Sequence, residues 1–390
     1  MAKYAYIGVS GIARKIKKMW VGVDGVAHKV KKAWIGVNGV ARLFFSGQGA
    51  TSKYGTTSEP LRLAVHSLAA ASTTNHALFG GGYRGSSSTG LTNYVTAYDT
   101  SLTRSAPTNL GTALFRLKAT SLNGNAFFTG GNNNKYGTGT AINVGTKVTN
   151  IYKYNPSLTQ TTGSLTTARD NHAVTSIGNR VICGGGGIQS STTALKSVEA
   201  FDESLTSTAL TDLTTGRAKF AATTVGNYAL FAFGTLNNSS ISAYIEVYDS
   251  SLTKQSNLTS MSDCGYDNVA VTVGNYAVIS IGQPSTVYKF VVVDKSLTVS
   301  YIDRPWTNAS YYSELASSTE GYAFIGGGYK GTTLKKDVVA IDESLTVTNQ
   351  TQLNDYKGNG AATSIGNYVL FGGGANSSGT VATVEVYQVI

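Results

Sequence analysis

The chain has 390 residues, of which only 13% are charged and 45 are glycine. Helix-forming residues are sparse, while Thr, Ser, Tyr, Val and Gly are abundant, and this mixture favours strands and tight turns. No apolar run approaches the roughly 18 residues that a membrane-spanning helix needs. The N-terminus also lacks the apolar core of a secretory leader. We therefore expect an all-β protein that reaches the outside of a cell only by lysis or as part of a particle.

The net charge of +10 is concentrated at the N-terminus. Residues 1–46 contain nine Lys or Arg residues and a single Asp, which gives this segment +8 and leaves +2 for the rest of the chain. The high isoelectric point is thus a property of a short arm. It does not indicate that the whole chain binds nucleic acid.

Residues 6–45 of this arm consist of three copies of a 14-residue unit, which begin at Tyr6, Trp20 and Trp34. Each copy has a two-residue turn signal between strand-forming residues, and Asp-Gly and Asn-Gly are the strongest signals of a short hairpin. The three turns are Ser10-Gly11, Asp24-Gly25 and Asn38-Gly39. The arm, residues 1–46, is therefore predicted to be a β-meander that is too small to be stable alone.

The basic residues of the arm recur in register from one unit to the next. Three interpretations stay open: a solubilising face that protects strand edges, a surface that docks into a larger assembly, or a site for a polyanion such as nucleic acid or a wall polymer. The residues concerned are Arg14, Lys15, Lys17, Lys18, Lys29, Lys31 and Lys32. The pattern Gly-Val-Asn-Gly-Val-Ala-Arg resembles N-terminal segments of phage and prophage tail proteins from Gram-positive bacteria, over about 45 residues. That resemblance implies attachment to a tail or particle protein.

Residues 47–390 contain two recurring phrases. The first is a turn followed by an apolar strand that ends in glycines, as in Asn179–Gly186; its seven copies are spaced by 46 to 54 residues. The second is Tyr-Asp-x-Ser-Leu-Thr with its variants, which occurs six times. A period near 47 with four short strands per unit is the signature of a propeller blade. We predict a seven-bladed β-propeller with four antiparallel strands, A to D, in each blade.

The last repeat supplies strands A, B and C, and the chain then ends. An unassigned segment, about Ser52 to Leu61, precedes the first strand A. A ring left open would have two unpaired sheet edges. We therefore expect the N-terminal segment to supply strand D of the last blade.

The double glycine followed by a Tyr-Asp strand resembles the kelch repeat, over residues 50–390. A typical kelch repeat has a tryptophan after the Tyr-Asp, where this chain has Ser-Leu-Thr. The resemblance implies the propeller fold. Because of this departure, it implies nothing about function.

No catalytic constellation stands out. The chain has no nucleophile elbow, phosphate loop or zinc-protease motif, and neither a metal nor another cofactor is expected. The aspartates of the Tyr-Asp phrase, with its variants, recur at one place in six blades, so we expect them to cap a turn. Cys183 and Cys264 are interpreted as unpaired thiols.

The loops locate the predicted recognition face. The A–B and C–D turns are short and nearly identical in all blades, whereas the B–C and D–A loops vary in length and content. Variation on a constant scaffold is typical of binding surfaces, although any one tyrosine there, and Trp306 equally, could simply pack against a neighbour. The candidate ligand-binding residues are Tyr83, Arg84, Tyr136, Arg169, Arg217, Tyr266, Trp306, Tyr311, Tyr329, Lys330 and Tyr356.

These observations favour a non-enzymatic recognition protein, associated with a phage or prophage tail, that binds a host surface glycan or protein. The arm would contact other tail or particle proteins; neither nucleic acid nor a membrane is an expected partner. Two alternatives remain. One is a sugar-active enzyme on a kelch propeller, an epimerase or a hydrolase. The other is an intracellular scaffold that binds peptides on the same face.

Overall fold

The computed structural model describes residues 6–9, 12–15, 19–23, 26–30, 32–37, 40–46, 50–85, 90–133, 146–187, 194–236, 240–258, 264–283, 289–306 and 311–390. All regular elements in these ranges are strands, so the described residues contain no helix that could cross a membrane. The contacts between Cα atoms divide the chain into two units. One is Met1–Ala50 with Ile390, and the other is Thr51–Val389.

The first unit contains three β-hairpins, one for each 14-residue unit of the sequence. Each hairpin is a two-stranded sheet of its own, whereas the sequence predicted one continuous meander. Pairing ends at Val9↔Ile12, Val23↔Val26 and Val37↔Val40, so each connection has two residues, as predicted. The connecting residues themselves lie outside the described residues. The strands are β1 (Tyr6–Val9), β2 (Ile12–Lys15), β3 (Met19–Val23), β4 (Val26–Val30), β5 (Lys32–Val37) and β6 (Val40–Ser46).

The basic residues of the arm fall partly on these strands. Arg14 and Lys15 lie on β2, Lys29 on β4 and Lys32 on β5. Lys17, Lys18 and Lys31 lie outside the described residues.

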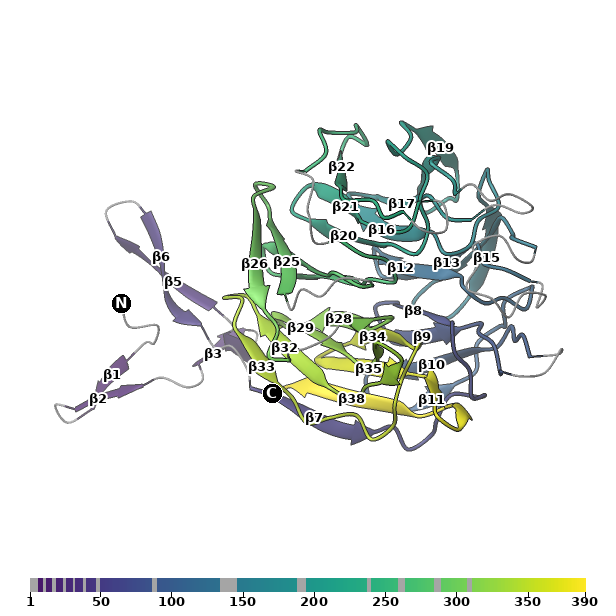
Figure 1. Ribbon diagram of the computed structural model, residues 1–390. Helices are drawn as coiled ribbons and strands as arrows, with labels where there is room; N and C mark the ends of the chain where they lie inside the picture. Colours follow the sequence, from purple (N-terminus) through teal and green to yellow (C-terminus); the bar gives the residue numbers. More distant parts are fainter. Residues whose placement is uncertain are drawn as a thin grey trace. The chain divides into compact units, whose positions relative to one another are not determined.

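The second unit is a ring of seven antiparallel sheets, which confirms the predicted seven-bladed propeller (Figure 1). Blade 1 consists of β8 (Ala69–Ser72), β9 (His76–Gly80), β10 (Val95–Asp99) and β11 (Arg104–Ser105), and blade 2 of β12 (Lys118–Leu122), β13 (Asn125–Thr129), β14 (Asn150–Tyr154) and β15 (Gln160–Ser164). Blade 3 consists of β16 (Ala173–Ile177), β17 (Arg180–Gly184), β18 (Val198–Phe201) and β19 (Ser207–Leu210). Blade 4 consists of β20 (Ala221–Val225), β21 (Tyr228–Ala232) and β22 (Ile245–Asp249). Two bridges, Ile245↔Leu258 and Tyr248↔Lys254, take the place of a fourth strand in blade 4.

Blades 5 to 7 follow the same order from the innermost strand outward. Blade 5 consists of β23 (Ala270–Val273), β24 (Tyr276–Ser280), β25 (Lys289–Asp294) and β26 (Val299–Asp303). Blade 6 consists of β28 (Leu315–Thr319), β29 (Tyr322–Gly326), β32 (Val338–Asp342) and β33 (Val347–Asn349). Blade 7 consists of β34 (Ala361–Ile365), β35 (Tyr368–Gly372), β38 (Val384–Val389) and β7 (Thr51–Thr56). Short pairings in the loops form β27 (Tyr311–Tyr312), β30 (Tyr329–Lys330), β31 (Thr333–Leu334), β36 (Ala375–Asn376) and β37 (Gly379–Thr380).

The ring closes as the sequence predicted. β7, from the start of the propeller, pairs antiparallel with β38 at its end, from Glu385↔Thr56 to Val389↔Thr51 (Figure 1). An ion pair of 2.7 Å between Lys53 Nζ and Glu385 Oε2 supports this pairing. The N-terminal strand therefore covers the outer edge of blade 7, which would otherwise be unpaired.

Small residues on the innermost strands let the seven sheets converge on the axis. Hydroxyl groups on neighbouring inner strands bond to one another, as in Thr175 with Thr224 at 3.0 Å and Thr223 with Thr272 at 2.7 Å. The glycines that end strand B also permit close approach. At Gly186, φ is +103° and a Cβ would lie 2.6 Å from the carbonyl oxygen of Asp170, so a side chain does not fit there.

The Tyr-Asp-x-Ser-Leu-Thr phrase forms the C–D turn, and the predicted capping role of its aspartate is confirmed. Asp249 Oδ1 accepts hydrogen bonds from the backbone amides of Ser251 and Thr253, at 2.9 and 3.0 Å. The same pair of bonds recurs in blades 1 to 6, with Asn155 as the cap in blade 2. The leucine of the phrase has a positive φ, 64° at Leu252.

The turn leucines pack between blades. Leu252 of blade 4 joins the apolar cluster between blades 3 and 4, and Leu297 of blade 5 joins that between blades 4 and 5. The leucine of the Ser-Leu-Thr phrase therefore packs at the interface with the preceding blade. Cys183, in the core, and Cys264 are not joined by a disulfide, and burial raises the pKa of the Cys183 thiol to about 12.

Candidate functional site

The B–C and D–A loops meet on one face of the propeller. In every blade a residue just before strand A forms a bridge with a residue just after strand B, which places the two loops side by side. The seven bridges are His66↔Tyr83, Phe115↔Asn132, Asp170↔Gly187, Ala218↔Thr235, Tyr266↔Gln283, Tyr312↔Tyr329 and Gly358↔Ala375. These loops therefore form the common face that the sequence analysis assigned to recognition.

The residue that follows each of these bridges lies in a ring around the axis. We call this set the axial ring; it consists of Ser67, Arg116, Asn171, Lys219, Asp267, Ser313 and Asn359. All seven have left-handed backbone conformations, with φ between 49° and 56°. From Ser67 through Ser313, each amide donates to the carbonyl of the ring residue in the preceding blade, at 2.7 to 3.3 Å. The ring thus holds one side chain from each blade at a fixed place near the axis.

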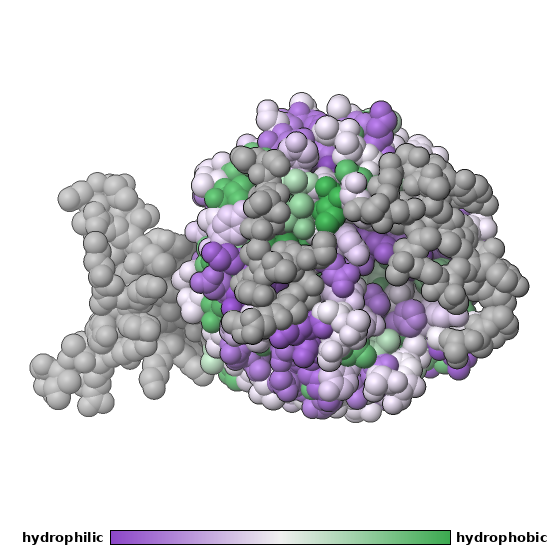
Figure 2. Space-filling model, in the orientation of Figure 1, coloured by the Kyte–Doolittle hydropathy of each residue, from purple (hydrophilic) through white to green (hydrophobic). Residues whose placement is uncertain are grey.

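A cavity of about 130 Å³ opens at the axial ring, and we call it the axial mouth. Six ring residues line it, all but Lys219, and its surface is mainly polar. A cavity with convergent polar groups is the usual form of a small-ligand site. Figure 2 shows one face of the propeller, where hydrophobic residues occur in small separate patches rather than in one broad area. The axial mouth is therefore a stronger candidate site than any apolar surface in that view.

One wall of the axial mouth is basic. Arg116 and Lys118, both from blade 2, line the cavity. Burial lowers the pKa of the Lys118 ammonium, and the charges of Asp267 and Asp170 oppose this effect. The lysine is thus held where water solvates its charge poorly.

An acidic residue and a tyrosine lie at blade 5. Burial raises the pKa of the Asp267 carboxyl, although Lys219, Lys118 and Arg116 act against that rise. Lys219 Nζ lies 3.9 Å from Asp267 Oδ2 and 5.5 Å from the centre of the Tyr266 ring. Lys219 therefore pairs with the carboxylate and contacts the face of the aromatic ring.

Tyr312 and Tyr329 form a stacked pair in blade 6, with ring centres 5.2 Å apart and planes 13° apart. The Tyr312 hydroxyl donates to the Gly331 carbonyl oxygen at 2.7 Å. A Cβ on Gly358 would lie 2.4 Å from Cε2 of Tyr329, so the ring rests on a glycine. Of the predicted residues, Tyr266 and Tyr329 thus lie beside the axial ring, together with Tyr312.

The predicted residues of blade 1 lie on the same face. The Tyr83 ring packs against His66, at 5.4 Å between ring centres, and against Phe115, at 6.0 Å. Arg84 is exposed, and its carbonyl oxygen accepts a bond from the Thr380 hydroxyl at 3.4 Å.

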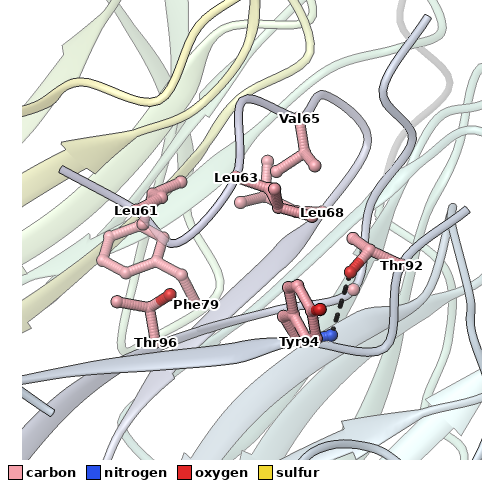
Figure 3. A pocket seen from close by; sticks show the side chains of 9 residues that line it. Leu61, Leu63, Val65, Leu68, Phe79, Thr92, Tyr94 and Thr96 are labelled. Atoms are coloured by element: carbon pink, nitrogen blue, oxygen red, sulfur yellow. Dashed lines mark hydrogen bonds between the residues drawn. The ribbon is translucent and has the colours of Figure 1, made fainter. Parts of the chain in front are cut away.

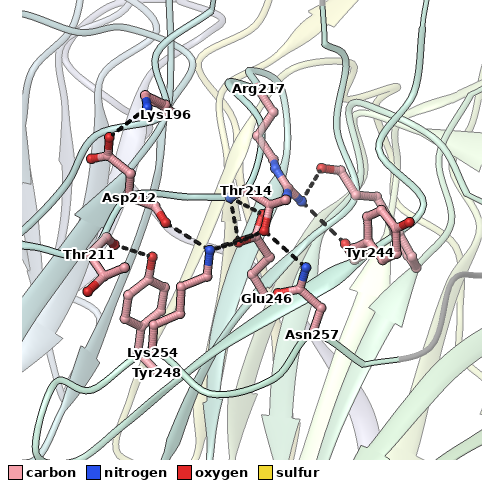
Figure 4. A network of polar contacts seen from close by, with 11 residues as sticks. Lys196, Thr211, Asp212, Thr214, Arg217, Tyr244, Glu246, Tyr248, Lys254 and Asn257 are labelled. Atoms are coloured by element: carbon pink, nitrogen blue, oxygen red, sulfur yellow. Dashed lines mark hydrogen bonds and ion pairs between the residues drawn. The ribbon is translucent and has the colours of Figure 1, made fainter.

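Arg169 and Arg217 do not face a ligand. Both side chains are fully buried and bind inside the blades: Arg169 pairs with Glu199, and Arg217 pairs with Glu246. Figure 4 shows the second pair. Arg217 also donates to the carbonyl oxygens of Phe233 and Tyr244, at 3.2 and 3.3 Å. The prediction that Arg169 and Arg217 bind a ligand is therefore wrong, because neither guanidinium has exposed surface.

A sequence signal for these ion pairs exists. The position two residues before the axial-ring residue carries a cation only in blades 3, 4 and 7, as Arg169, Arg217 and Lys357. Only those blades carry a glutamate at the second or third place of strand C. The pairs are Arg169 with Glu199, Arg217 with Glu246, and Lys357 with Glu385. The corresponding residues in blades 1, 2, 5 and 6 are Val65 with Thr96, Leu114 with Tyr152, Gly265 with Val291, and Tyr311 with Val339.

The remaining predicted residues are scattered. Trp306 packs, half-buried, against the apolar cluster between blades 5 and 6. Tyr356 is 39% exposed, and Lys336 Nζ lies 4.6 Å from its ring centre. Lys330 pairs through its backbone with Tyr311, whose side chain lies outside the described residues, as does all of Tyr136.

A second, apolar cavity of about 10 Å³ lies beside blade 1, between the segment that follows β7 and strands β9 and β10 (Figure 3). Leu61, Leu63 and Val65 line one side of it. That volume holds one water molecule at most, so this cavity is a packing feature. Among the described residues, no group of three or more His, Cys, Asp or Glu side chains could hold a metal ion.

The search for family models found no match, and no curated protein matches the chain. Among solved structures, the chain is similar to that of YjhT, with a TM-score of 0.51 and 14% sequence identity. The similarity covers 85% of this chain and 99% of the YjhT chain. At this identity it shows the propeller fold alone.

Proposed function

We propose that this chain is a non-enzymatic recognition protein of a phage or prophage tail, and that its propeller binds a host surface saccharide at the axial mouth. The main support is the mouth itself, where the blades contribute polar side chains of different kinds around one cavity. Tyr266 and the Tyr312–Tyr329 pair supply aromatic rings beside it. Polar groups that fix orientation, with aromatic faces next to them, suit a sugar.

The proposed attachment to a particle rests on the arm. Its three hairpins carry most of the chain's net positive charge, and isolated two-stranded hairpins are marginally stable in water. Docking on other tail or particle proteins would supply the missing contacts. Deleting residues 1–46 should abolish incorporation into particles and leave saccharide binding unchanged.

A glycan array with the full-length protein tests the binding function. We expect a defined subset of glycans to bind, Tyr266→Ala to lose this binding, and Tyr301→Ala to retain it. Tyr301 is a matched control because it is 44% exposed on the outer strand β26. An array without any bound glycan would contradict the proposal. Binding to host cells that protease treatment abolishes would indicate a protein receptor instead.

A sugar-active enzyme is the second candidate, because one cavity brings together a carboxyl with a raised pKa, Asp267, and an ammonium with a lowered pKa, Lys118. Such shifts are common among catalytic acids and bases. Incubation with the glycans that bind, followed by product analysis, separates the candidates. Turnover that Asp267→Asn abolishes would favour the enzyme.

A further inference from the structure

Blade 2 departs from the other blades at a position that faces the axial mouth. The second residue after each axial-ring residue lies at or just before the start of the innermost strand, where six blades have Ala, Val or Leu. The seven residues are Ala69, Lys118, Ala173, Ala221, Val269, Leu315 and Ala361. Lys118 is the one charged residue among them, in a strand that otherwise needs small or apolar side chains. Lys118 is half-buried, and partial loss of water around a cation is costly, so this exception needs an explanation.

Blade 2 departs a second time within the axial ring. A left-handed backbone suits Asn and Asp, which occupy the ring in blades 3, 5 and 7, and it is unfavourable for a long side chain such as arginine. Arg116 of blade 2 and Lys219 of blade 4 nevertheless occupy the ring, with φ of 56° and 55°, but only Arg116 lines the axial mouth. Residues that keep an unfavourable conformation are often retained for a functional reason.

Together these departures make the axial mouth unequal across its width. Arg116 and Lys118 form its basic wall on blade 2. The two carboxylates of the lining already have cations beside them: Asp267 has Lys219 at 3.9 Å, and Glu314 has Arg304 at 2.9 Å. The half-buried Lys118 ammonium would donate a charge-assisted hydrogen bond to an anion bound in the mouth.

We propose that the axial mouth binds an acidic group of the ligand, a carboxylate or a phosphate, through Lys118 and Arg116. The neutral part of the ligand then lies towards Tyr266 and Asp267. This inference rests on the proposed function, because it names the chemical class of the saccharide that the propeller recognises.

Isothermal titration of the full-length protein tests the inference, with trigalacturonate and its fully methyl-esterified form as a matched pair of ligands. A glycerol phosphate trimer tests phosphate as the alternative source of charge. We expect at least one acidic trimer to bind about tenfold more tightly than the ester, as a charge-assisted hydrogen bond implies. Whichever acid binds identifies the source of the charge.

Substitutions that copy other blades separate binding from folding. Arg116→Asn introduces the ring residue of blades 3 and 7, and Lys118→Ala introduces the residue of blades 1, 3, 4 and 7. Each should weaken acidic-trimer binding about tenfold while the melting temperature stays the same or rises by roughly 2 °C. Glu320→Asn is the control: Glu320 also has a left-handed backbone, with φ of 50°, but it lies in the turn between β28 and β29 and does not line the mouth, so affinity should stay unchanged.

Several results would overturn the inference. If the methyl ester binds as tightly as the acid, the site reads neutral sugar, and the proposed function survives without the acidic group. If binding persists in both variants, the basic arm holds the acid instead. If neither acidic trimer binds while neutral glycans on the array do, the ligand carries no acid. A melting temperature that falls by 5 °C or more in both variants would assign these two residues to folding.

Discussion

The buried ion pair of blade 4 offers a sharp test of how the propeller tolerates charge in its interior (Figure 4). Glu246 Oε1 accepts from Arg217, and Oε2 accepts from Lys254 at 2.6 Å and from the Thr214 amide at 2.8 Å. Arg217 and Glu246 are both fully buried. The informative changes are Glu246→Thr, Arg217→Val, and the double variant Arg217→Val/Glu246→Thr, which copies the Val65 and Thr96 pair of blade 1.

Each single change removes one member of the buried Arg217–Glu246 pair, and this typically costs about 3–5 kcal/mol of unfolding free energy. The double variant leaves no unpaired charge in the core. It still deprives the Thr214 amide and the partly exposed Lys254 of an acceptor, which costs about 1–3 kcal/mol. Independent effects would instead sum to about 6–10 kcal/mol, so the expected coupling energy is at least about 3 kcal/mol.

Urea denaturation, followed by circular dichroism, measures these differences. At about 2 °C per kcal/mol, the single variants should also melt roughly 6–10 °C below the parent. A double variant as unstable as the sum of the singles would refute the reasoning, since the pair would then act through independent contacts. Single variants within 1 kcal/mol of the parent would show that water reaches the pair.

Three further predictions follow from the fold and the site. Deleting residues 1–56 removes β7 and should cause aggregation, measured by light scattering, because β38 loses its partner. Deleting residues 1–46 should leave the melting temperature unchanged, and equal behaviour of the two truncated proteins would contradict the closing role of β7. The pKa of Asp267 is raised in the folded state, so ionisation of its carboxyl destabilises the fold, and the free energy of unfolding should fall as pH rises from about 3.8 through that raised pKa. Asp267→Asn should remove this fall, and the same pH profile in the variant and the parent would contradict the prediction. Gly358→Ala should displace the Tyr329 ring, whose Cε2 would lie 2.4 Å from the new Cβ, and weaken glycan binding without unfolding the chain; unaltered array binding would exclude Tyr329 from the site.

The fold was predictable because repetition makes every signal appear many times. Seven copies of one strand pattern fixed the number of blades, and the missing fourth strand of the last copy identified β7 as its replacement. The turn aspartates were predictable for the same reason. The three hairpins of the predicted arm were predictable too, because pairing within a hairpin is local. The structure differs from a β-meander in that each hairpin forms a two-stranded sheet of its own.

The site was harder to predict, because its residues are defined by departures from the repeat. Tyr266 and Tyr329 stood out as aromatic residues in variable loops, and both lie near the axial ring. Arg169 and Arg217 were assigned to the ligand because their charge was considered without the glutamates that accompany them in the same blades. Lys118 escaped notice because only an alignment of the seven innermost strands shows a lysine where the others have small or apolar residues.

The closure by β7 has a consequence for synthesis of the chain. Its strand is made before the rest of the propeller, and its partner β38 is made last, so at 5–20 residues per second the wait is roughly 20–70 s. During that time β7 and the growing blades present unpaired edges to other nascent copies. The +8 charge of residues 1–46 precedes the waiting strand, and repulsion between such arms would disfavour closure of one ring with the strand of a neighbour. The segment that we propose attaches the protein to a particle would thus also keep neighbouring chains apart on the polysome.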